Sequence, residues 1–261
     1  MDSGYRSPLV DFFRRGEVAR DVRLLAAQGA LAPRAHEQLA LLILLSADAD
    51  ALVARTAQGT LDALPAQALE AFLARADVPE PMREFFAGRG ITPASAPALE
   101  AEAPLVETDA APLPHDTPEN QADERAADDP QVLSSLSIVE RMKLAMKGTR
   151  GQRASLIRDS NKLVAAAVLS SPKLTETEVE AFAKMANVSE DVLRIIANNR
   201  SWTKNYSILS ALARNPKTPI GVSMQLVQRL NDRDVKSLSM DRNVPEAVRL
   251  VARKFVVKAL K

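Results

Sequence analysis

Residues that could carry acid–base, nucleophilic or metal chemistry are few and far apart in this chain. The two histidines are His36, in a helix-rich N-terminal region, and His115, in a segment rich in proline and acid. Cysteine is absent, which excludes disulfides, thiolate zinc sites and a cysteine nucleophile. A histidine-paired nucleophile or a histidine-rich metal site cannot be assembled from these residues. We therefore expect a protein that is not an enzyme and that binds no cofactor or metal.

Paired carboxylates and glycines give no stronger indication of catalysis. The pairs Asp48/Asp50 and Asp232/Asp234 lie in predicted turns, where short carboxylates satisfy backbone N–H groups. The stretch between Gly148 and Gly151 lacks the spacing and the Lys-Ser/Thr end of a phosphate-binding loop. These features predict local backbone structure.

Basic residues offer more, because charge is unevenly distributed. Residues 132–261 hold 23 Lys and Arg against 11 Asp and Glu, and the remaining residues hold 11 against 22. The net charge of +1 thus hides a basic C-terminal part and an acidic remainder. A basic surface favours an anionic partner such as nucleic acid or an acidic peptide, including the acidic segment of the chain itself.

The C-terminal part of the sequence repeats about every 28 residues, with Asp159, Asn187, Asn215 and Asn243 in register. Such a period is typical of stacked helical hairpins. Asx residues beside Pro or Ser favour helix starts, so we interpret this series as structural. Five residues after each Asx stands a β-branched residue: Val164, Val192, Ile220 and Val248. Of these, Val192 and Ile220 are predicted to face the core between helices. Ser137, with Glu140 three positions on, predicts a capping box at an earlier helix start.

The same register aligns Arg158, Arg214 and Arg242, so we expect these arginines to lie on a common basic rim. Trp202 aligns with leucines and is predicted to be in the core, whereas Tyr206 aligns with acids and is predicted to be on the surface. The candidate partner-binding residues are Arg158, Lys162, Arg200, Lys204, Tyr206, Arg214, Lys217 and Arg242.

Composition divides the chain into three parts. Residues 1–90 show helical spacing of apolar residues and predict an N-terminal helical-repeat domain. Residues 91–131 are rich in Pro, Ala and acid and predict a disordered linker, because they cannot bury enough surface to offset ordering. Residues 132–261 form the predicted basic C-terminal domain. We predict an all-α protein of two short α-solenoids.

The Asp48-Ala49-Asp50 turn, followed by Val53 and Arg55, resembles the inter-helix turn of HEAT-type repeats. The unit beginning Arg214-Asn215-Pro216 is similar to the leucine-rich-repeat variant class of short helical repeats, and the whole chain resembles bacterial two-domain proteins. The resemblance implies stacked helix pairs that meet ligands on an extended surface.

We therefore expect a non-enzymatic scaffold or adaptor that uses its helical surface for protein–protein interaction. The alternative is binding of nucleic acid, or of another polyanion, by the basic C-terminal domain. The longest apolar run, residues 39–45, is too short to cross a bilayer, so we expect no membrane partner and a cytoplasmic location.

Overall fold

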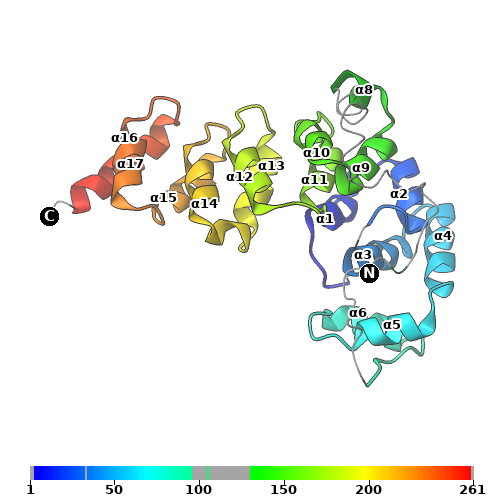
Figure 1. The fold of residues 1–261 in the computed structure, drawn as a ribbon. Helices are drawn as coiled ribbons and strands as arrows, with labels where there is room; N and C mark the ends of the chain where they lie inside the picture. Colours follow the sequence, from blue (N-terminus) through cyan, green and yellow to red (C-terminus); the bar gives the residue numbers. More distant parts are fainter. Residues whose placement is uncertain (1–2, 33, 96–104, 106–129, 260–261) are drawn as a thin grey trace, which may run out of the picture. The chain divides into compact units, whose positions relative to one another are not determined.

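A computed structural model of the chain describes residues 3–32, 34–95, 105 and 130–259. Every regular element in these ranges is a helix, and none of the described residues forms a strand (Figure 1). The prediction of an all-α protein is confirmed at this level. Most of the predicted linker, residues 96–104 and 106–129, lies outside the described residues, and helix α8 already begins at Pro130.

The chain divides by internal contacts into two units. The first comprises residues 1–153 and 167–172, and the second comprises residues 154–166 and 173–261. Helices α8 and α9 therefore belong with the first unit by this criterion. The domain boundaries at 90 and 132 stay predictions.

The first unit is built around helix α3. Nine of its eleven residues are buried, because leucine, isoleucine and alanine occupy almost its whole circumference. Helices α1, α2 and α4 pack against it. The helices are α1 (Pro8–Arg14), α2 (Arg20–Ala27), α3 (Ala35–Leu45), α4 (Ala51–Asp62), α5 (Ala66–Leu73), α6 (Glu80–Ala87), α8 (Pro130–Ser135), α9 (Ile138–Lys147) and α10 (Arg150–Leu156), the last of which extends into the second unit.

Side-chain caps fix where several of these helices begin. The Asp50 carboxylate accepts from the backbone N–H groups of Leu52 and Val53 at the start of α4. Ser137 and Glu140 form the predicted capping box at the start of α9, so that prediction is confirmed.

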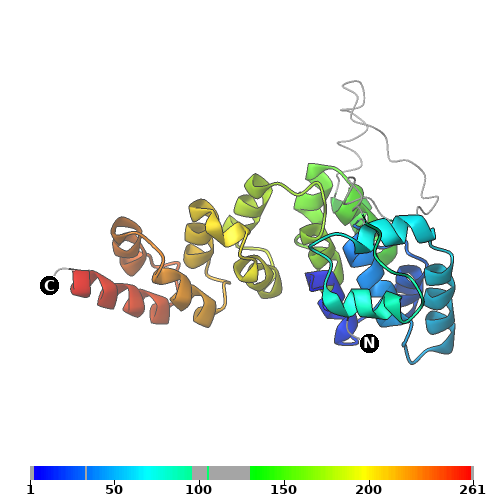
Figure 2. The ribbon, with the colours of Figure 1, turned by 90° about the horizontal axis from the view of Figure 1, so that it is seen from below.

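The second unit contains the helices that follow α10 in chain order, seen from yellow-green to red in Figure 2. They are α11 (Lys162–Leu169, shared between the units), α12 (Glu176–Lys184), α13 (Glu190–Asn198), the short 3₁₀ helix η2 (Trp202–Lys204), α14 (Tyr206–Arg214), α15 (Ile220–Val227), α16 (Asp232–Met240) and α17 (Glu246–Ala259). Contacts join α12 to α14, α14 to α15, and α15 and α16 to α17.

Three of the nine-residue helices in this unit are each followed by a connection of five residues. The helices are α12, α14 and α16, and the connections are residues 185–189, 215–219 and 241–245. The fourth residue of each connection is buried: Val188, Thr218 and Val244. Each connection thus has the same length and a buried side chain at its fourth position.

The links before α12, α14 and α16 vary instead: they comprise residues 170–175, 199–205 and 228–231. Helices α13, α15 and α17 begin at Glu190, Ile220 and Glu246, with spacings of 30 and then 26 residues, because α13 is one residue longer than α15 and the link after α13 is three residues longer than the link after α15. The 28-residue period is thus an average, and the third predicted unit is shifted by two residues.

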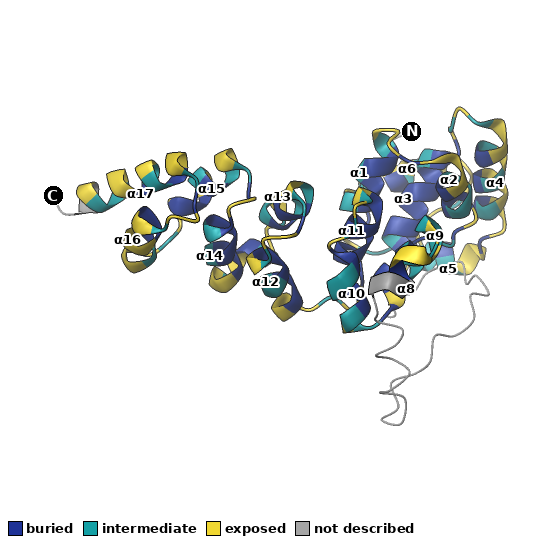
Figure 3. Ribbon diagram, turned by 90° about the horizontal axis from the view of Figure 1, so that it is seen from above, coloured by how far each residue is buried: buried dark blue, intermediate teal, exposed yellow. Residues whose placement is uncertain are grey.

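This shift overturns the predicted burial of Ile220. Val164, Val192 and Val248 are buried, but Ile220 is 48% exposed. It is the first residue of α15, whereas Val192 and Val248 are the third residues of their helices. The buried contacts of α15 come from other positions, among them Leu226. Figure 3 shows the alternation of buried and exposed residues along these helices.

Candidate binding groove

A groove of about 820 Å³ crosses the second unit along helix α14. Tyr206 and Arg214, the first and last residues of α14, both line it, so it runs the length of a helix about 12 Å long. Between them Ser207, Ser210 and Ala211 present small side chains. The remaining lining residues come from α12 and from the three five-residue connections: Glu180, Lys184, Ala186, Asn215, Pro216, Asp241 and Asn243.

Tyr206 is held rigidly on one wall of the groove. Its hydroxyl donates to the Asp234 carboxylate of α16 and accepts from the backbone N–H of Asn231, 3.1 Å away. Burial is the main cause that raises the pKa of Tyr206, and the hydrogen bond to Asp234 raises this pKa further. The same hydrogen bond lowers the pKa of Asp234. The residue is nevertheless 40% exposed, so part of this fixed aromatic side chain faces the solvent.

The cations of the groove are paired within the protein. The Arg214 guanidinium lies 2.6 Å from the Asp234 carboxylate, and one of its nitrogens is 3.3 Å from Ser237 Oγ. The Lys184 ammonium lies 2.5 Å from the carboxylate of Glu180, one turn earlier on α12. These pairs leave the groove without an excess of positive charge.

Asn215 ties two of the connections together and fixes the groove between them. Its side-chain N–H group donates to the carbonyls of Ala183 and Met185, at 2.8 and 2.9 Å, and its oxygen accepts from the Lys217 backbone N–H. Only 4% of the residue is exposed. By helix position it corresponds to Met185 and Asp241, the first residues of their connections, and not to Asn187 or Asn243.

The structure places the eight predicted partner-binding residues in different surroundings. Only Tyr206 and Arg214 line the groove. Lys162 forms an ion pair with Asp191 at 2.7 Å. Within the described ranges no ion pair is found for five exposed cations: Arg158, Arg200, Lys204, Lys217 and Arg242. The predicted site is therefore not a single cluster.

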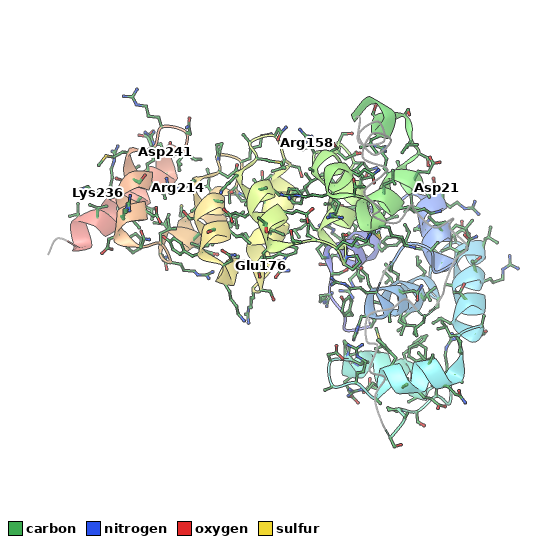
Figure 4. All side chains as sticks on the ribbon, in the orientation of Figure 1. Asp21, Arg158, Glu176, Arg214, Lys236 and Asp241 are labelled. Atoms are coloured by element: carbon green, nitrogen blue, oxygen red, sulfur yellow. The ribbon has the colours of Figure 1, made fainter. Side chains whose placement is uncertain are left out.

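The predicted alignment of three arginines is wrong for one of them. Arg158 and Arg242 each stand four residues before a helix start, in connections, whereas Arg214 ends α14 and corresponds to Lys184 and Met240. Figure 4 shows Arg158 well apart from Arg214. Trp202, predicted to be in the core, is only partly buried and begins η2, and Tyr206 is exposed as predicted.

Sequence reasoning missed one pairing of chemical groups in the first unit. His36 Nε2 lies 3.7 Å from the Asp77 carboxylate, and the imidazole stacks on Tyr5 and meets the edge of Phe72. No local pattern signals this cluster, because its members come from distant parts of the chain. Among the described residues, no three His, Cys, Asp or Glu side chains are grouped so that they could hold a metal ion.

Comparison with protein-family models, with curated proteins and with solved structures finds no match to this chain. In the part of the chain that the structure describes, no helix combines the length and the apolarity needed to cross a membrane.

Proposed function

We propose that this protein is a non-enzymatic cytoplasmic adaptor, built on HEAT-like helical repeats, whose groove along α14 binds a segment of a partner polypeptide. The observation that carries this proposal is the groove itself: an 820 Å³ depression with a floor of small residues and a fixed, exposed tyrosine on its wall. A small-residue floor lets a partner main chain approach closely, and rigid aromatic residues are common anchors in protein interfaces.

The contacts around the groove support a preformed site. Tyr206 and Arg214 are both bound to Asp234, and Asn215 binds two carbonyls of the neighbouring helix end and connection. A partner that binds here orders few additional side chains, which lowers the entropic cost of association. Preorganisation of this kind supports peptide recognition at the groove.

A selection from a library of random 12-residue peptides displayed on phage, with the full-length protein as bait, tests the proposal without knowledge of the partner. Ser210→Tyr fills the floor of the groove without changing its charge. Its matched control is Gln225→Tyr, at an exposed position of α15 that does not line the groove. We expect selected peptides to bind Ser210→Tyr at least about tenfold more weakly, and Gln225→Tyr as the wild type.

Selected peptides that bind both variants and the wild type equally would contradict a role for the groove. Fluorescence of the single tryptophan, Trp202, checks that each variant is folded, because this residue lies in the same unit. A circular dichroism spectrum provides the second check.

Nucleic-acid binding is the second candidate function, and the five exposed cations without an ion pair in the described ranges favour it. Binding through phosphate contacts weakens steeply with salt, whereas peptide binding through packing and neutral hydrogen bonds depends on salt far less. Titration of labelled duplex and single-stranded oligonucleotides at two salt concentrations therefore separates the two functions. Replacing Arg200, Lys204 and Lys217 together by Gln should weaken any oligonucleotide binding strongly and leave selected peptides bound.

A further inference from the structure

One acid of the groove differs from its charged neighbours. Glu180 is paired with Lys184, and Arg214 is paired with Asp234. Asp241, which also lines the groove, has no ion pair within the described ranges. Once the internal pairs are set aside, the side-chain charge that remains in the groove is the single negative charge of Asp241.

The helix ends around the groove add to this negative potential. Helices α12, α14 and α16 all end beside the groove, and the carbonyl end of a helix carries a partial negative charge. Helices α12 and α14 end in the bases Lys184 and Arg214, which compensate that charge. Helix α16 ends in Met240 and is followed by Asp241, so the partial negative charge of the helix end and the charge of the Asp241 carboxylate add together.

The immediate surroundings of Asp241 supply one hydrogen-bond donor and leave room for a cation. The Asn243 backbone N–H donates to Asp241 Oδ1 at 3.0 Å. Arg242, the next residue, is exposed but does not line the groove. Met240, the preceding residue, is 67% exposed and likewise does not line the groove.

We propose that the segment bound in the groove is basic and that it places a lysine or arginine side chain at Asp241. This inference rests on the proposed function and specifies the partner's chemistry. The charge expected of the partner is thus opposite to the charge that the net charge of the C-terminal half predicts. The reason is that local ion pairs, and not the total charge, set the electrostatic potential where a partner makes contact. An acidic segment is disfavoured at the same place by like-charge repulsion.

Three fluorescein-labelled pools of 12-residue peptides test the inference. The pools are random over neutral residues and carry Lys, Gln or Glu at the central position. Anisotropy with the full-length protein at low salt should show the Lys pool binding about threefold to tenfold more tightly than the Gln pool, the size expected of one partly exposed charge pair. The Glu pool should bind least.

Asp241→Asn should remove this preference while keeping the acceptor for Asn243, and Asp241→Lys should reverse it toward the Glu pool. Asp232→Asn is the matched control, since Asp232 is exposed, begins the same helix and does not line the groove. Equal binding of the three pools, a preference for Glu, or a Lys preference that survives Asp241→Asn would overturn the inference.

The two proposals fail in distinguishable ways. If the pools bind without charge preference but bind Ser210→Tyr more weakly than the wild type, the proposal of a basic partner is overturned and the proposal of a binding groove is retained. Pools that bind Ser210→Tyr as well as the wild type overturn the groove itself. If no pool binds the wild-type protein while phage-selected peptides do, the basic partner is overturned and the groove is retained.

Discussion

The two-residue shift in the second unit makes a sharp prediction about stability. Val192 is 1% exposed on α13, and Ile220 is 48% exposed at the start of α15. The 28-residue period of the sequence treats the two positions as equivalent, whereas the structure does not. Alanine at each position therefore discriminates between the average period and the observed helix starts.

Val192→Ala deletes two fully buried carbon atoms. At about 0.8 kcal/mol for each buried methylene-sized group, the transfer loss is about 1.6 kcal/mol, and the cavity raises the total to about 2–3 kcal/mol. Ile220→Ala deletes three carbons, but half of their surface is already in water and solvent fills the space. Its expected cost is at most about 1 kcal/mol, smaller although the deletion is larger.

Urea unfolding followed by Trp202 fluorescence measures both costs, because the only tryptophan lies in η2, which packs against α13 and α14. The reasoning is refuted if Ile220→Ala destabilises the protein as much as Val192→Ala, or if Val192→Ala is neutral. Equal slopes of the free energy of unfolding against urea are required for the comparison.

Three further changes test contacts described above. Asn215→Ala leaves two backbone carbonyls without their donor and should cost about 2–3 kcal/mol in urea unfolding, whereas Asn243→Ala, at an exposed position, should change stability by less than about 0.5 kcal/mol. Burial raises the pKa of Glu37, despite a hydrogen bond from Ser7, so the native state holds that proton more tightly than the unfolded chain and stability falls as pH rises above 4.5. Glu37→Gln should flatten this fall in urea midpoints measured up to about pH 8, and an unchanged slope would exclude Glu37 as its source. The hydrogen bond from Arg20 lowers the pKa of Asp50 to about 2, so its contribution is complete above 3.8 and is lost as pH falls through about 2. Thermal melts should accordingly show Asp50→Asn less stable than the wild type at neutral pH, with the difference vanishing below about pH 2.

Local chemistry allowed several features to be predicted from the sequence. The capping box of Ser137 and Glu140 depends on residues three positions apart, and the all-helical class depends on spacing within each segment. The helix starts of the second unit could not be predicted as well from the sequence. The extra residue of α13 and the longer link before α14 are offset by the shorter link before α16, so Asn187 and Asn243 keep the average period while α15 is displaced from it.

The groove could not be predicted, because its chemistry depends on partners from different helices. Arg214 is a free cation in the sequence and a paired one in the structure, and its partner Asp234 lies 20 residues further along the chain. Tyr206 was correctly expected at the surface, but its anchoring by Asn231 and Asp234 follows from the packing of α14 beside α16. Net charge per segment carries no information on such pairing.

The contrast between constant connections and variable links has a practical consequence for protein engineering. Residues 215–219 hold Asn215 and the buried Thr218, so inserting a tag there should dislodge the groove. Residues 228–231 occupy the position at which neighbouring links already differ in length, so a loop or a fluorescent reporter inserted directly after the exposed Gln228 should be accommodated, provided that Asn231, which binds Tyr206 and caps α16, stays next to that helix. The variable links thus offer a place for grafting new sequence, whereas the five-residue connections should be kept unchanged.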